Sequence, residues 1–325
     1  MRYLEQVKTE NNSFISYLKG SLIFIFFHFL GQIPLYIYLI SKSPNIEGYR
    51  DQNELLSSLP SNTTLFLILL PFAVTAPFIY IVVTKLHRQS FKSLVSIRNK
   101  VDFNRILFSF LLWGGISTLM ISLDYCMSPY DYEWNFKPIP FLVLLLISIV
   151  LIPIQTTVEE LIFRGYLIQG FGLLFKNRWL PLLFTSVLFG LLHIWNPEIE
   201  KLGINLLWYY IGTGIFLGII TLMDEGIELA LGFHAANNLV TVLMVTASWT
   251  AFQTESLLID NVKSLSRSKV ENTITFLAER TFVNETFKFE TLLIHSMDDG
   301  DGIIRSKLKY EYLDNINFWL GTNIF

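Results

Sequence analysis

The chain has 325 residues, of which 52% are hydrophobic and 16% carry a charge. An average soluble domain carries about 25% charged residues, so this composition, with 28 phenylalanines, indicates an integral membrane protein. The net charge of −3 at pH 7 is too small to suggest nucleic-acid binding, and a single cysteine, Cys126, excludes an intrachain disulfide and any multi-cysteine metal site.

Apolar segments dominate the chain from residue 20 to residue 250. The first follows the polar residues 1–18 and is too long for a cleavable signal peptide, so we expect a retained anchor. A helix needs about 20 apolar residues to cross the hydrocarbon core. The fourth segment is too long for one simple span, and Pro153 predicts a kink in it. We therefore predict an all-α, polytopic transmembrane helical bundle of about seven spans: 20–41, 64–84, 105–123, 139–174, 179–195, 203–223 and 226–250.

The loops between these segments predict the orientation of the bundle. The loop after the second segment is strongly basic, whereas the loop 124–138 holds Lys137 against three acidic residues. The positive-inside rule then predicts a cytoplasmic N-terminus, and we expect the protein in the cell membrane. The basic residues of the first of these loops are Lys85, Arg88, Lys92, Arg98, Lys100 and Arg105.

The sequence divides into residues 1–250, a multi-pass membrane domain, and residues 252–325, a polar C-terminal tail or small appended unit. The tail is rich in charge and contains no spanning run. Seven spans would place it outside the cell. Within it, Thr273–Leu277 and Phe287–Phe289 are typical of short strands, and Met297–Gly302 is typical of a turn.

Two adjacent acids, Glu159 and Glu160, lie in the apolar fourth segment. An ionisable side chain at the centre of a membrane helix costs about 2.5–3.5 kcal/mol on insertion scales, so such residues usually face a protein interior or a wet cavity. Residues four apart share a helix face, and the spacing therefore predicts an ion pair between Glu160 and Arg164. Glu159 lies about 100° around the helix from Glu160 and is freer to face a partner or a water.

Two histidines on other segments add to this pair. His193 ends the fifth segment, and Glu159 and His193 are each roughly 25 Å from the turn near Asn177 if both helices are continuous and antiparallel. The spacing thus predicts that they lie at one depth and share a water. On the seventh segment, His234 and Asn238 are four apart and project from one face, beside small residues that allow a close helix approach: Gly232, Ala235 and Ala236.

Three motifs on these segments resemble those of the CAAX protease and bacteriocin-processing family of intramembrane endopeptidases. They are Glu159-Glu160-x-x-x-Arg164, Phe189-x-x-x-His193 and His234-x-x-x-Asn238, and they match in order and in their placement on apolar helices. The motif core covers residues 139–250. Members commonly have a further hydrophobic helix after the third motif, which this chain lacks within its tail.

The resemblance implies peptide-bond hydrolysis within the membrane. In that case Glu159 would be the general base and His193 would help to position and deprotonate a water. His234 and Asn238 would donate hydrogen bonds to the tetrahedral oxyanion. Glu160 and Arg164, with Phe189 beside His193, would hold the site together, and Glu160 could share in catalysis.

A zinc version of this site is also chemically open. His193, His234 and Glu159 or Glu160 could supply two histidines and one carboxylate, with a fourth position left for water. The glutamate mechanism that the resemblance implies needs no metal, and we favour a site without a cofactor.

Two further functions stay open at this point. The same polar cluster could bind a partner helix in a non-proteolytic protein of bacteriocin self-immunity or membrane scaffolding. It could also form the proton relay of a transporter, although the sequence shows no inverted repeat and no paired broken helices. For the protease, the expected partners are the lipid bilayer and a membrane-associated peptide or protein, lipidated or not.

Overall fold

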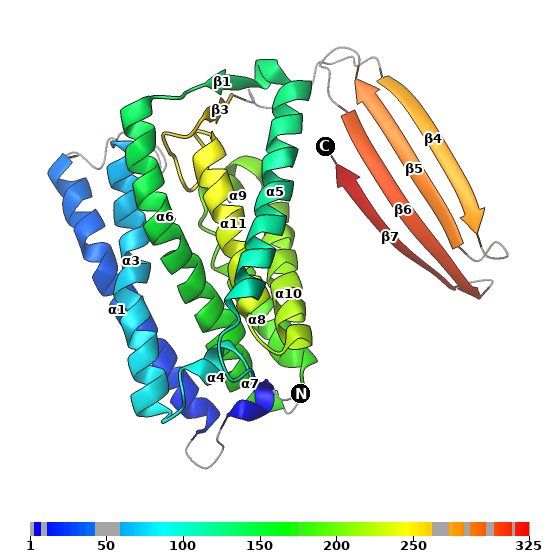
Figure 1. Ribbon diagram of the computed structural model, residues 1–325. Helices are drawn as coiled ribbons and strands as arrows, with labels where there is room; N and C mark the ends of the chain where they lie inside the picture. Colours follow the sequence, from blue (N-terminus) through cyan, green and yellow to red (C-terminus); the bar gives the residue numbers. More distant parts are fainter. Residues whose placement is uncertain are drawn as a thin grey trace. The chain divides into compact units, whose positions relative to one another are not determined.

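The computed structural model describes residues 3–7, 12–42, 59–175 and 177–261, and four strands between residues 273 and 324. The chain divides into two compact units, Met1–Asn261 and Val262–Phe325. The first unit is a bundle of helices, and the second is a sheet (Figure 1).

Long helices build the first unit, and each predicted apolar segment contains one. They are α1 (Phe14–Lys42), α3 (Ser61–Ile81), α5 (Phe103–Met127), α6 (Pro138–Glu160), α7 (Ile168–Phe175), α8 (Trp179–Leu191), α10 (Leu207–Asp224) and α11 (Glu228–Met244). Two π-helical turns extend this set: η3 (Val82–Leu86) continues α3, and η5 (Leu161–Leu167) joins α6 to α7. The short helices are η1 (Leu4–Gln6), α4 (Lys92–Val95), η4 (Pro129–Asp131), α9 (Pro197–Leu202) and η6 (Ile204–Leu206).

Five helical segments among the described residues are long and apolar enough to cross a membrane, which agrees with a polytopic helical bundle. They are Phe14–Lys42, Ser61–Leu86, Phe103–Met127, Pro138–Phe175 and Ile204–Asp224. Large apolar side chains on their outer faces are more than 60% exposed, as lipid-facing positions require: Leu22, Phe26, Phe108, Leu111 and Leu146.

The fifth and seventh segments form shorter helices than the sequence predicts. Helix α8 has 13 residues and ends at Leu191, because the chain turns there and Pro197 starts a new helix. Helix α11 has 17 residues, bounded by the turn at Gly226 and by extended backbone from Val245. Each is shorter than the roughly 20 residues of a full span.

Helix α6 of the fourth segment packs against α3 on one side and against α11 on the other (Figure 1). Helix α11 also packs along α5 at close range. A Cβ on Gly232 would lie 2.0 Å from the carbonyl oxygen of Ile106, so only glycine allows this approach. The predicted role of a small residue on α11 is confirmed at Gly232, and the contact fixes the position of the His234 helix.

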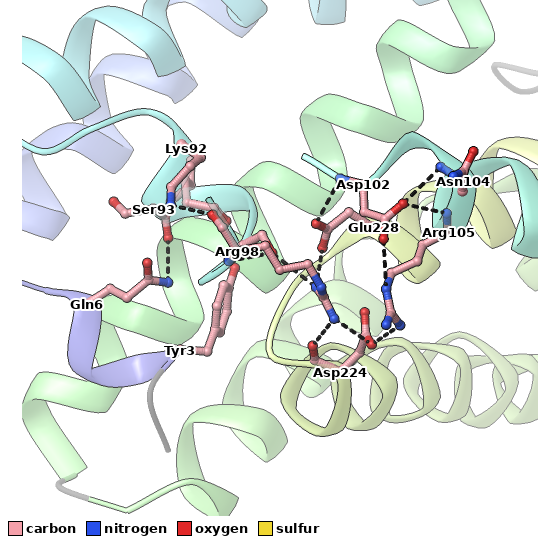
Figure 2. A network of polar contacts seen from close by, with 12 residues as sticks. Tyr3, Gln6, Lys92, Ser93, Arg98, Asp102, Asn104, Arg105, Asp224 and Glu228 are labelled. Carbon is pink, nitrogen blue, oxygen red and sulfur yellow. Dashed lines mark hydrogen bonds and ion pairs between the residues drawn. The ribbon is translucent and has the colours of Figure 1, made fainter. Parts of the chain in front are cut away.

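A polar clamp ties the loop after η3 to the turn between α10 and α11 (Figure 2). The guanidinium of Arg98 donates to the carboxylate of Asp224 at 2.8 Å and to Glu228 at 3.1 Å, and Arg105 also pairs with Asp224. Tyr3 donates to the carbonyl of Leu94 at 2.6 Å, which attaches the N-terminal segment to the same loop. Glu228 is fully buried, and the clamp gives its carboxylate a cationic partner, without which the buried charge would be costly.

A small three-stranded sheet of order β1-β3-β2 belongs to the first unit. Strand β1 (Tyr132–Trp134) follows α5, β2 (Val245–Thr246) follows α11, and β3 (Leu258–Asp260) pairs antiparallel with β1 and parallel with β2. Residues 252–261 are therefore part of the helical unit.

The second unit is a four-stranded antiparallel sheet of order β4-β5-β6-β7. Its strands are β4 (Thr273–Phe282), β5 (Phe287–Ser296), β6 (Gly302–Leu313) and β7 (Ile316–Ile324). The two predicted strands lie within β4 and β5, and both are longer than predicted. The turn predicted at Met297–Gly302 lies outside the described residues except for Gly302.

Candidate active site

The two glutamates are the last residues of α6, where the helix changes to the π-helical turn η5. In η5 the amide of Ile168 bonds to the carbonyl of Phe163, five residues back. Such turns shift the faces of a helix by one residue and are frequent at functional sites. The turn therefore sets how the residues after Glu160 face the bundle.

Glu160 and Arg164 form the predicted ion pair, and both are buried. The Nη1 of Arg164 donates to Glu160 Oε1 at 2.8 Å, with the two side chains 1% and 0% exposed. The guanidinium also lies over the ring of Phe189, 4.3 Å from its centre, and reaches the carbonyl of Gly214 at 3.5 Å. These contacts join η5 to α8 and α10, so the pair acts as a cross-link between helices.

His234 joins this pair from α11. Its Nδ1 lies 2.7 Å from Glu160 Oε1, and since a carboxylate oxygen accepts, the Nδ1–H is the donor. Its Nε2 lies 3.6 Å from Glu159 Oε2. One imidazole therefore contacts both glutamates, with one nitrogen anchored and the other turned to Glu159.

Glu159 is the more accessible of the two carboxylates. Its side chain is 15% exposed, whereas that of Glu160 is fully buried. The amide of Gln155, one helical turn earlier, donates to Glu159 Oε1 at 2.6 Å. Glu159 thus has one oxygen held by Gln155 and the other free to meet His234 Nε2 or a water.

Asn238 lies in the same cluster, one turn beyond His234 on α11. Its amide donates to Gln155 Oε1 at 3.1 Å, and its Oδ1 accepts from the amide of Asn237 at 3.2 Å. Among the described residues its second amide hydrogen has no acceptor.

His193 lies in the turn after α8 and does not contact the carboxylates directly within the described part of the chain. Its Nδ1 donates to the carbonyl of Phe189 at 2.7 Å, which leaves Nε2 of the neutral ring as an acceptor. Its ring stacks on Tyr210 with centres 4.2 Å apart. We predicted equal depths for Glu159 and His193 from two continuous helices, whereas α8 ends two residues before His193.

The ring of Phe189 is the link between the two histidines. Its centre is 4.7 Å from that of His193 and 6.2 Å from that of His234. The structure therefore brings together Glu159, Glu160, Arg164, His234 and Asn238, and the ring of Phe189 lies next to both His234 and His193.

The described residues do not gather the ligands of the zinc site with two histidines and one carboxylate. In the described ranges, no three histidine, cysteine, aspartate or glutamate side chains are placed to hold a metal ion. The Nδ1 hydrogen bonds of His193 and His234 leave the Nε2 atom of each ring open to other partners.

The structure places three residues at the site that were not among the candidates from the sequence: Gln155, Asn237 and Tyr210. Gln155 could have been found from its four-residue spacing to Glu159, and Asn237 from its position beside Asn238. Tyr210 carries no signal in the sequence, because its stacking on His193 depends on how α10 packs against α8.

Comparison with known proteins agrees with the resemblance. The family model described as type II CAAX prenyl endopeptidase Rce1-like matches residues 138–240, which include every candidate site residue. An uncharacterized protein of Bacillus subtilis, YyaK, is 30% identical over 249 residues, covering 72% of this chain and 82% of YyaK. No solved structure matches the chain.

Proposed function

Because the chain belongs to the Rce1-like family of type II CAAX prenyl endopeptidases, we propose that it cleaves a membrane-associated peptide with Glu159 as the general base. At the family level it is a CAAX-protease-like intramembrane endopeptidase and an integral membrane protein.

The observation that carries this proposal is the difference between the two glutamates. Glu160 is fully buried and bonded to Arg164 and His234, so it has no access to a substrate. Glu159 is partly exposed, and its Oε2 faces an imidazole nitrogen at 3.6 Å. A general base needs reach to a water and a partner for the proton, and Glu159 has both.

The proposed reaction begins with a water on Glu159 Oε2. The carboxylate takes a proton from the water while the oxygen of the water attacks the carbonyl carbon of the scissile bond. The tetrahedral intermediate then collapses: the C–N bond breaks, and the proton held by Glu159 passes to the leaving nitrogen. Positioned acid–base groups of this kind contribute about 10²–10⁴-fold to rate.

Two side chains of α11 support the intermediate in this scheme. The second amide hydrogen of Asn238 can donate to the oxyanion, and His234 can donate from Nε2 when both its nitrogens are protonated. Removing one such donor typically costs about 10²–10³-fold in kcat. His193, with Nε2 as an acceptor, would orient the water or the substrate amide.

The expected substrate is a peptide held at the bilayer, since Glu159 and Glu160 lie on the helical segment Pro138–Phe175, which is long and apolar enough to span it. A lipid chain on the peptide would anchor it beside the apolar outer faces of the bundle. We propose that the N-terminus and the loop 87–102 face the cytoplasm of a plasma-membrane protein, on the distribution of basic residues.

The test is cleavage of a lipidated peptide by the purified protein in micelles, followed by mass spectrometry. We expect Glu159→Gln to abolish cleavage while the protein still inserts and folds. Glu255→Gln is the matched control, since Glu255 pairs with Lys137 outside the site, and it should cleave at the wild-type rate. Wild-type cleavage by Glu159→Gln would refute the assignment of the base.

The same assay tests metal dependence. We expect cleavage to be unchanged after incubation with a chelator, because the proposed roles use side chains alone. Loss of activity with the chelator and its return with Zn²⁺ would require a metal-based mechanism instead.

A further inference from the structure

A chain of side-chain hydrogen bonds from three helices ends on Glu159. The indole Nε1 of Trp113 on α5 donates to Asn237 Oδ1 at 3.1 Å, and the amide of Asn237 donates to Asn238 Oδ1 at 3.2 Å. The amide of Asn238 donates to Gln155 Oε1 at 3.1 Å, and that of Gln155 donates to Glu159 Oε1 at 2.6 Å. We call Trp113, Asn237, Asn238 and Gln155 the amide chain.

The two ends of the amide chain fix the direction of every bond in it. An indole N–H can only donate, and an ionised carboxylate can only accept. Asn237 must therefore turn its oxygen to Trp113, and Gln155 must turn its nitrogen to Glu159. Reversing any amide between them would set donor against donor, so all four donors point toward Glu159.

The environment makes this ordered chain effective. Gln155 is 4% exposed, and Asn237 and Asn238 are half-buried. Hydrogen bonds that run in one direction strengthen one another by polarisation in such surroundings, by about 10–30% per bond. A buried amide without partners would be costly, so the chain favours one rotamer of Gln155.

The last bond of the chain distinguishes the two oxygens of Glu159. Oε1 is held by Gln155, whereas Oε2 lies 3.6 Å from His234 Nε2 and has no closer polar partner among the described residues. A carboxylate fixed through one oxygen presents the other in a constant direction. The geometry thus makes Oε2 the oxygen that meets the water.

We propose that Gln155 is a positioning residue for Glu159, held in place by Trp113, Asn237 and Asn238. This inference rests on the proposed function for its effect on rate, because the positioned group is the proposed base. The contacts themselves can be tested without catalysis.

The first test is the variant Gln155→Met, which keeps the size of the side chain and removes its amide. We expect kcat to fall about 10- to 100-fold with KM unchanged, since a misplacement of about 1 Å can cost 10²-fold. The matched control is Gln169→Met, because Gln169 is a buried glutamine of the same long helix that bonds to the carbonyl of Ser93 instead. Rates are compared per folded molecule.

An unchanged kcat in Gln155→Met, or a change confined to KM, would overturn the proposal. An equal loss in Gln169→Met would also overturn it, since any buried amide would then have the same effect. Trp113→Phe keeps an aromatic ring stacked on Phe233 and removes only the first donor, so its kcat should fall less than that of Gln155→Met.

A double-mutant cycle tests whether the chain acts as one unit. Asn237→Ala should lower kcat more in the wild-type background than in the Gln155→Met background, where only its effect through Asn238 on the oxyanion remains. Independent, multiplying effects would show that Asn237 does not act through Gln155.

The last test is infrared spectroscopy, which does not depend on activity. The carboxylate band that disappears in Glu159→Gln belongs to Glu159. This band should shift in Gln155→Met and stay in place in Gln169→Met. An unshifted band in Gln155→Met would overturn the positioning role, whereas absence of cleavage by the wild-type protein with a shifted band would refute the proposed function alone.

Discussion

Replacing Arg164 by methionine should destabilise the protein through the charge it leaves behind. Arg164 and Glu160 are 1% and 0% exposed, and the salt bridge joining them is 2.8 Å long. Without Arg164, Glu160 keeps only His234 on Oε1, and its Oε2 already has no hydrogen-bond partner among the described residues. Breaking one partner of a buried pair costs about 3–5 kcal/mol, which is a large part of the stability of most proteins.

A second variant separates the charge effect from the loss of packing. Glu160→Gln combined with Arg164→Met removes both charges and leaves a side-chain oxygen for His234. Replacing both partners of a buried ion pair is often nearly neutral, so we expect the double variant to be more stable than Arg164→Met alone.

The assay is equilibrium unfolding in mixed micelles, followed by circular dichroism. We expect the free energy of unfolding of Arg164→Met to lie about 3–5 kcal/mol below that of the wild type. A value within about 1 kcal/mol of the wild type, or a double variant no more stable than the single one, would refute the reasoning.

Three further predictions concern the fold around the site. Burial lowers the pKa of His87 to about 4, against about 6.5 in the unfolded chain, so protonation favours unfolding. The free energy of unfolding should therefore fall by up to about 2–3 kcal/mol as the pH drops from 6.5 to 4. Unfolding experiments at each pH should show a smaller pH dependence in His87→Asn. Gly232→Ala should lower the free energy of unfolding by about 1–3 kcal/mol or prevent folding, because its Cβ meets the backbone of α5. The control is Gly115→Ala, whose Cβ meets nothing within 4 Å, and its melting temperature should be unchanged or higher. Arg98→Ala should lower the melting temperature because it leaves the buried carboxylate of Glu228 without its cation, whereas Lys100→Ala, at an exposed position of the same loop, should not. Equal effects of the two substitutions would contradict the clamp.

The sequence predicted most of the bundle because membrane helices must bury their backbone polar groups and present apolar side chains over a fixed length. It also predicted the pair of Glu160 and Arg164, since the four-residue spacing brings them onto one face. The ends of α8 and α11 were less predictable, because apolar composition continues past Leu191 and Met244 while the helices do not.

The contacts of the histidines could not be predicted from spacing. Distance from a turn estimates depth in the membrane, but it gives no rotation about the helix axis. The π-helical turn η5 changes the rotation of the side chains about the helix axis, and no pattern in the local sequence predicts this turn. His234 therefore contacts both glutamates, whereas His193 lies against Phe189 and Tyr210.

The central claim is that the two adjacent glutamates have different tasks. The most direct measurement compares Glu159→Gln and Glu160→Gln in two assays, single-turnover cleavage of a lipidated peptide and the free energy of unfolding. We predict that Glu159→Gln loses cleavage at wild-type stability, whereas Glu160→Gln loses stability because Arg164 is left without its carboxylate. Wild-type cleavage by Glu159→Gln, or loss of stability in that variant equal to the loss in Glu160→Gln, would contradict the claim.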